Sequence, residues 1–253
     1  MVRDGLTGGV HVKRFTTNSE IEILCEAMIK DFFKSKRYAK MLCVDIEAFV
    51  TEYLGIPIVY ETFAESDPGR IGFLSDGKRP LWVARDNIKQ QVVFPSDTVV
   101  LDKFLLSVKE SARKRFTIAH EGAHVMLKRH VPMQSSPASA FHSEFDCEMA
   151  YSPDMFKEMM SVNECFANRA AACFLMPGFL VESVLERYNH SQPVILYEGN
   201  ILAQEQKLII QRMADALGVS YTAFFHRLNE LALFDMRPIE EYLHNSLLCG
   251  GGV

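Results

Sequence analysis

Two histidines and a glutamate are spaced so that they could hold and use a metal ion. The run His120-Glu121-Gly122-Ala123-His124 has the pattern HExxH. On a helix, residues i and i+4 lie one above the other, so both imidazoles can bind one zinc ion from the same face. Glu121, beside the first ligand, can take a proton from the attacking water. The pentapeptide therefore predicts a zinc-dependent hydrolase.

The surroundings of this motif argue against the alternative, a chance pattern on a solvated helix surface. The segment that carries the motif is apolar nearly all round, through Phe116, Ile118, Ala119, Ala123, Val125, Met126 and Leu127. A buried polar side chain without a partner costs several kcal/mol. A metal ion is the economical partner for two histidines and a glutamate in such a helix.

A zinc site needs a third protein ligand and an open position for water. Glu164 is the favoured candidate, because it precedes a run of small residues that could pack closely against the motif helix. Asn168, one turn later on the same face, could accept the outer N–H of a ligand histidine. Rival third ligands, all on an expected loop, are His130, His142, Glu144, Asp146 and Glu148.

Two long helices are expected to present these residues. Apolar periodicity predicts one helix over 111–129 and a second over 159–176. Residues 130–153 between them form an expected irregular excursion, of a length at which loops are often functional. Further upstream, Asn18-Ser19-Glu20 offers a helix cap, and Val44 to Leu54 reads as another helix that Gly55 ends.

Short β segments are expected between the helices. Ile71–Leu74 and Leu81–Ala84 look like two strands around a glycine-containing turn. Further strands are expected at 56–60, 92–94 and 98–101, and the chain after Pro177-Gly178 reads as helices. We therefore expect an α+β fold, with a small mixed or antiparallel sheet packed on helices. The expected division is a loose tail at 1–18, a core at 19–185 and a helical segment at 186–253 packed on that core.

Composition limits the classes of partner. The chain of 253 residues is 48% hydrophobic and has a formal net charge of -5, so broad binding to a phosphate backbone is not expected. Six cysteines without a CxxC pair indicate reduced thiols. No secretory signal is visible, nor a run of the roughly 18 apolar residues that a membrane span requires. We expect a soluble cytoplasmic protein without a membrane or nucleic-acid partner; its oligomeric state is left open.

Two blocks of the sequence resemble a known family. Arg115-Phe116-Thr117-Ile118-Ala119-His120-Glu121-Gly122-Ala123-His124 is similar to the R-F-T-x-A-H-E-x-x-H run of the ImmA/IrrE zinc metallopeptidases. The run from Glu164 to Pro177, ECFANRAAACFLMP, is similar to their E-x-x-A-N-x-F-A-x-x-L-L-M-P run. The resemblance spans about residues 20–235, and it implies a zincin-like core. Ala170 stands where the family often has Phe, and the distance from His124 to Glu164 is long for the family.

The resemblance implies specific roles. His120, His124 and Glu164 would hold one Zn²⁺ per chain, and Glu121 would be the catalytic base of an endopeptidase. The implied substrate is a regulatory protein such as a helix-turn-helix transcriptional repressor. Candidate donors to the oxyanion are Tyr151, His142 and Arg169. The alternative is a non-catalytic regulator of the same fold that binds a partner protein or DNA.

Overall fold

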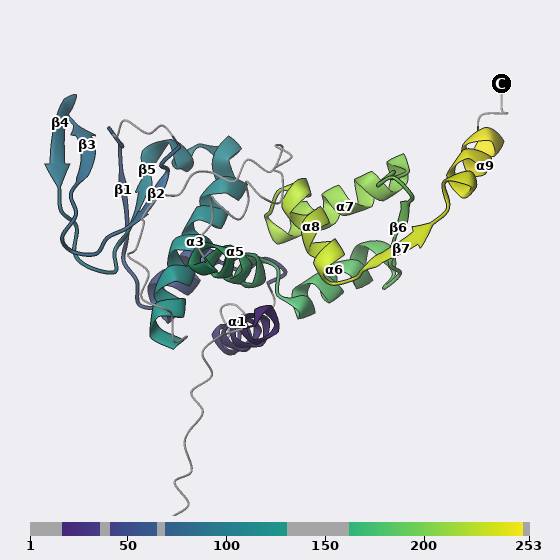
Figure 1. The fold of residues 1–253 in the computed structure, drawn as a ribbon, viewed down its shortest axis with the longest axis horizontal. Coiled ribbons are helices and arrows are strands. Elements are labelled where there is room, and N and C mark those ends of the chain that lie inside the picture. Colours follow the sequence, from purple (N-terminus) through teal and green to yellow (C-terminus); the bar gives the residue numbers. More distant parts are fainter. Residues whose placement is uncertain (1–16, 36–40, 65–68, 131–161, 250–253) are drawn as a thin grey trace, which may run out of the picture.

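The computed structural model describes residues 17–35, 41–64, 69–130 and 162–249, and within them it has an α+β fold (Figure 1). The longer helices are α1 (Asn18–Phe32), α3 (Ser111–His130), α5 (Val162–Leu175), α6 (Gly178–Asn189), α7 (Gln204–Leu217), α8 (Tyr221–Glu230) and α9 (Ile239–Cys249). The shorter ones are α2 (Ile46–Ala48), the π-helical turn η1 (Phe49–Tyr53), and the 3-10 turns η2 (Lys103–Leu106) and η3 (Val108–Glu110). The strands are β1 (Ile58–Glu61), β2 (Gly72–Leu74), β3 (Leu81–Arg85), β4 (Ile88–Val92), β5 (Val99–Asp102), β6 (Val194–Tyr197) and β7 (Phe234–Arg237).

Three helices form the centre of the molecule. Figure 1 shows α3 and α5 crossing there, with α1 beside α5, and these pairs pack against each other along their lengths. The packing is close because α5 presents small side chains, and Ala167, Ala170 and Ala171 are fully buried. The cap of α1 lies one residue earlier than expected: Thr17 accepts from the N–H of Glu20, whose carboxylate accepts from the N–H of Thr17.

A three-stranded sheet lies against α3. Its order is β1-β5-β2, with β1 parallel to β5 and β2 antiparallel to it. Val99, Val100 and Leu101 of the central strand are fully buried, as expected for a strand covered on both faces. β2 is an outer strand of this sheet and contacts α3. The edge of the sheet therefore runs beside the helix that carries the HExxH motif.

The expected pairing of Ile71–Leu74 with Leu81–Ala84 is wrong. β2 pairs with β5, while β3 pairs with β4 in a separate antiparallel hairpin. Asp86 and Asn87 connect β3 to β4, and both have positive φ, of 51° and 62°. A two-residue hairpin turn of the favoured twist requires positive φ at both positions, and Asp and Asn tolerate it. This local turn decides the pairing.

The sequence led us to expect only helices in the C-terminal part of the chain, but this part also contains two strands. β6 and β7 pair in parallel, with Val194 opposite Phe234 and Tyr197 opposite Arg237. Each strand has four residues, too few for hydrophobic periodicity to identify it. No helix in the described ranges is both long and apolar enough to cross a membrane.

Two arginines and two glutamates join this part to the core. The guanidinium of Arg227 is fully buried and donates to the carbonyl of Met176 and to the carboxylates of Glu22 and Glu230. Arg169 forms ion pairs with the same two carboxylates, at 3.1 and 2.8 Å. This Arg227 cluster connects α1, α5 and α8 with its charges balanced, as buried charges require.

Candidate metal centre

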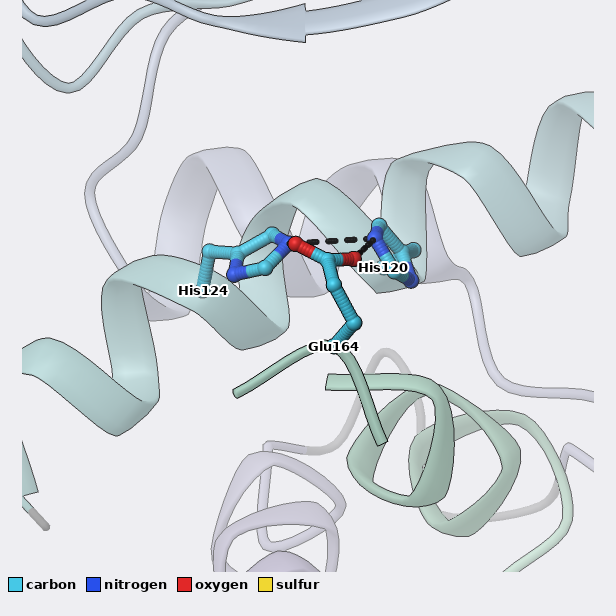
Figure 2. Close-up of side chains that lie close together, drawn as sticks. All are labelled: His120, His124 and Glu164. Carbon is cyan, nitrogen blue, oxygen red and sulfur yellow. Dashed lines mark hydrogen bonds and ion pairs between the residues drawn. The ribbon is translucent and has the colours of Figure 1, made fainter. Parts of the chain in front are cut away.

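The three expected ligands converge on one point between α3 and α5. Nε2 of His120 lies 3.0 Å from Nε2 of His124. Oε2 of Glu164 lies 3.3 Å from Nε2 of His120, and Oε1 of Glu164 lies 3.5 Å from Nε2 of His124. Figure 2 shows both imidazoles and the carboxylate pointing toward each other from the two helices. Two elements far apart in the sequence thus supply one group of potential ligands.

The spacing of these atoms fits a tetrahedral ion. A zinc ion with ligands about 2.0–2.1 Å away needs its ligand atoms about 3.3–3.4 Å apart. The distance of 3.0 Å between the two Nε2 atoms and the distances of 3.3 and 3.5 Å from each Nε2 to its nearer oxygen of Glu164 lie around that value. Two imidazole nitrogens and one carboxylate oxygen are also a donor set typical of catalytic zinc. Within the described residues, His120, His124 and Glu164 are the group of histidine, cysteine and carboxylate side chains that could hold a metal.

The side chain of Asn168 contacts the first imidazole. Its Oδ1 lies 2.8 Å from Nδ1 of His120. When Nδ1–H donates to this amide oxygen, Nε2 of His120 keeps its lone pair and can bind a metal. Glu164 and Asn168 stand four residues apart on α5, so one helix face supplies a potential ligand and the residue that contacts another.

Glu121 is fully buried beside the ligands, at the contact between α3 and β2. A Cβ atom at Gly72 would stand 2.9 Å from Oε1 of Glu121 and 2.5 Å from Cγ2 of Thr117. Only a glycine therefore lets β2 approach α3 this closely without a shift. The backbone of the sheet edge lies directly against the glutamate of the motif.

Burial and charge both act on the protonation of this group. Burial raises the pKa of Glu121, and the charge of Glu164 adds to the increase, while His120, His124 and Arg70 oppose it. Burial lowers the pKa of His124, but the hydrogen bond with Glu164 and the charges of Glu121 and Glu164 outweigh it and raise the pKa overall. The two carboxylates and the imidazoles thus form one coupled electrostatic unit.

Other candidate residues are placed elsewhere or lie outside the described residues. His130 is exposed at the last residue of α3, ten positions after His120, which is about 15 Å along a helix. Arg169, a candidate oxyanion donor, is held by Glu22 and Glu230 in the Arg227 cluster. Five further candidates lie outside the described residues: His142, Glu144, Asp146, Glu148 and Tyr151.

Sequence reasoning missed two residues of this site. Gly72 interrupts an apolar strand, and a glycine there is a signal for close backbone approach. Arg70, just before β2, lies with its guanidinium 5.7 Å from the centre of the Phe73 ring, and its charge acts on Glu121. Nothing in its sequence context distinguishes Arg70 from a surface arginine, because its proximity to Glu121 depends on the packing of β2 against α3.

A protein-family model matches the part of the sequence that contains the site. Residues 104–229 match the IrrE N-terminal-like domain of peptidase family M78. The matched residues include α3, α5 and the helices up to α8. The match therefore contains all three potential metal ligands and Glu121. A comparison with curated proteins finds no match.

Proposed function

Because this chain belongs to the ImmA/IrrE family of metallopeptidases, we propose that it is a zinc-dependent endopeptidase whose ion is held by His120, His124 and Glu164. The observation that carries the proposal is the convergence of these three side chains: the two Nε2 atoms lie 3.0 Å apart, and each lies 3.3–3.5 Å from one oxygen of Glu164. A non-catalytic member of the fold would not need Glu121 buried beside them.

Each residue of the site has a separate role in peptide hydrolysis. Zinc, when bound, supplies a Lewis acid that polarises the scissile carbonyl and makes water a better nucleophile. Glu121 takes the proton of the attacking water and delivers it to the leaving amine. Asn168 holds His120 in the tautomer and orientation that bind the metal. Burial of Glu121 against Gly72 keeps its carboxylate in one place.

β2 is the strand along which we expect an extended substrate to bind. β3 offers a peptide no unpaired edge, because the backbones of Thr62 and Ala64 bond to it on one side and β4 pairs with it on the other. β2 is an outer strand, and its Gly72 touches Glu121. A peptide added to this edge would carry its scissile bond past the carboxylate.

The family resemblance supplies the first candidate substrate, a helix-turn-helix repressor, which we propose is cut in the cytoplasm. The four cysteines whose side chains are described are free thiols, in keeping with a reducing compartment. The substrate to test first is a helix-turn-helix repressor, chosen from the genes that neighbour this one.

The test is cleavage of that repressor by three purified chains. Wild type should cut it, and a zinc chelator such as 1,10-phenanthroline should abolish cutting. Glu121→Gln should lose activity while keeping its metal. Glu110→Gln, which alters a partly exposed glutamate before α3, is the matched control and should cut like wild type. Undiminished cleavage by Glu121→Gln would refute the proposed mechanism, and binding of the repressor without cleavage by wild type would favour the non-catalytic alternative.

A further inference from the structure

A cavity of about 430 Å³ lies in the C-terminal part of the chain, apart from the metal ligands on α3 and α5. Figure 1 shows α7, α8 and the β6–β7 pair on the far side of α3 and α5 from the β3–β4 hairpin. The lining residues come from the turn after β6, the beginnings of α7 and α8, and α9: Asn200, Ile201, Leu202, Lys207, Tyr221, Thr222, Phe225 and Tyr242. This volume falls within the range of small-molecule sites.

Local structure fixes the rim of this cavity. Gly199 and Asn200 both have positive φ, of 77° and 59°, and they turn the chain so that Ile201 pairs back with Tyr197. The side chain of Gln206 accepts from the backbone N–H of Ile195, which joins α7 to β6. The turn and the start of α7 are thereby held against the strand pair.

Aromatic rings form much of the lining. Tyr221 and Phe225 stand one turn apart on α8 and stack at 6.5 Å with an interplanar angle of 19°. Phe225 packs on Phe234 of β7 at 5.0 Å, and Tyr242 packs on Tyr197 of β6 at 5.3 Å. Each of these rings packs against another ring, so the lining offers flat aromatic surfaces to a planar ligand.

The charge of the lining is positive. Lys207 is the charged residue among the lining side chains, and its ammonium forms no ion pair or hydrogen bond with any residue that the structure describes. Tyr221 and Thr222 are the first two residues of α8, and Lys207 lies in the first turn of α7. The positive ends of two helix dipoles therefore add to the lysine charge.

We propose that this cavity binds a small planar aromatic anion, stacked on Tyr221 and Phe225 with its negative group at Lys207. The rings supply the apolar contact, and the lysine supplies the charge that selects an anion. An aromatic carboxylate and a nucleoside monophosphate share this chemistry. The site does not depend on the metal or on peptidase activity.

Calorimetric titration of the full chain with 1-naphthoate and with adenosine monophosphate tests the proposal. At least one of the two should bind saturably. The one that binds more tightly shows whether the cavity prefers an aromatic carboxylate or a nucleoside monophosphate. Inorganic phosphate and neutral adenosine should each bind at least tenfold more weakly, because each lacks half of the recognised chemistry. Absence of saturable binding by both aromatic anions would overturn the proposal.

Substitution at the exposed Lys207 locates the binding without disturbing the core. Lys207→Glu should weaken binding at least tenfold, and Phe225→Ala should weaken it further if thermal unfolding shows that it folds. Lys103→Glu, at another exposed lysine, on η2, is the matched control and should bind like wild type. Equal affinity of wild type and Lys207→Glu would overturn the assignment to this cavity.

Discussion

The side-chain oxygen of Asn168 lies 2.8 Å from Nδ1 of His120. This contact joins α5 to α3 at the point where the two helices bring the three potential metal ligands together. With Nδ1 of His120 at Asn168, Nε2 of the same ring faces Glu164 and His124. The metal centre thus depends on the packing of two helices as well as on its ligands.

Loss of this hydrogen bond should weaken metal binding. Asn168→Ala is expected to lower zinc affinity roughly 10- to 100-fold, because the imidazole is no longer held in its binding orientation. Competition with a chromophoric chelator measures the affinity. Asn189→Ala, which removes a partly exposed side chain at the end of α6, is the control and should bind zinc like wild type. Unchanged affinity in Asn168→Ala would mean that the contact does not orient the ligand.

Gly72→Ala should reduce cleavage while leaving the metal in place. The new Cβ would meet Cγ2 of Thr117 at 2.5 Å and Oε1 of Glu121 at 2.9 Å, so β2 or the carboxylate has to move. The expected result is a lower kcat with zinc content unchanged. Kinetics of peptide cleavage together with metal analysis measure both quantities.

A second substitution separates this effect from general damage. Adding Thr117→Ser removes the closest methyl group but keeps the hydroxyl that donates to the carbonyl of Arg113. The double variant should recover part of the lost kcat. If Gly72→Ala alone cleaves as fast as wild type, close approach of β2 does not position Glu121.

Gly122→Ala should destabilise the fold although it improves helix propensity. Alanine in place of glycine gains about 1 kcal/mol in a helix interior, but here the Cβ would stand 2.8 Å from Cγ2 of the buried Val50. Overpacking of this kind costs about 1–3 kcal/mol. Urea unfolding should show a net loss that Val50→Ala partly restores. A variant more stable than wild type would contradict the close contact of α3 with η1.

Glu22 should make stability depend on pH in acid. Burial alone would raise its pKa, but the hydrogen bonds from Arg227 and Cys173 and the charges of Arg227 and Arg169 outweigh burial and lower the pKa below its ordinary value. The stabilisation is then complete above the unfolded-state pKa, about 4.3, and is lost as the pH falls through the lower folded-state value.

Urea unfolding of wild type and Glu22→Gln between pH 3 and 7 measures this dependence. Wild type should be the more stable chain at neutral pH, and the difference should shrink below about pH 4.3. Comparison of the two chains at each pH cancels any loss of metal that both share. A constant difference across the range would show that Glu22 does not titrate with a lowered pKa.

Local patterns predicted the helices that matter most for the site. Residues 111–129 were expected as a helix and form α3, and the spacing of His120 and His124 already implied one shared ligand position. Glu164 and Asn168 were placed on one helix face, where the structure has them. Helix periodicity and i,i+4 spacing are properties of short segments, so a single sequence contains them.

Contacts between distant segments could not be predicted in the same way. β2 pairs with β5 and packs against α3, whereas the sequence offered only the neighbouring strand at Leu81–Ala84 as its partner. The role of Gly72 follows from the same packing. The Arg227 cluster likewise joins residues up to 205 positions apart, which no local pattern reports.

Zinc analysis of the purified chain tests the central claim most directly. Mass spectrometry of the metal content should find about one zinc per chain in wild type and in Glu121→Gln, since Glu121 is not a ligand. His120→Ala, His124→Ala and Glu164→Ala should each lose it. A zinc content in His124→Ala or Glu164→Ala equal to that of wild type would contradict the metal centre described here.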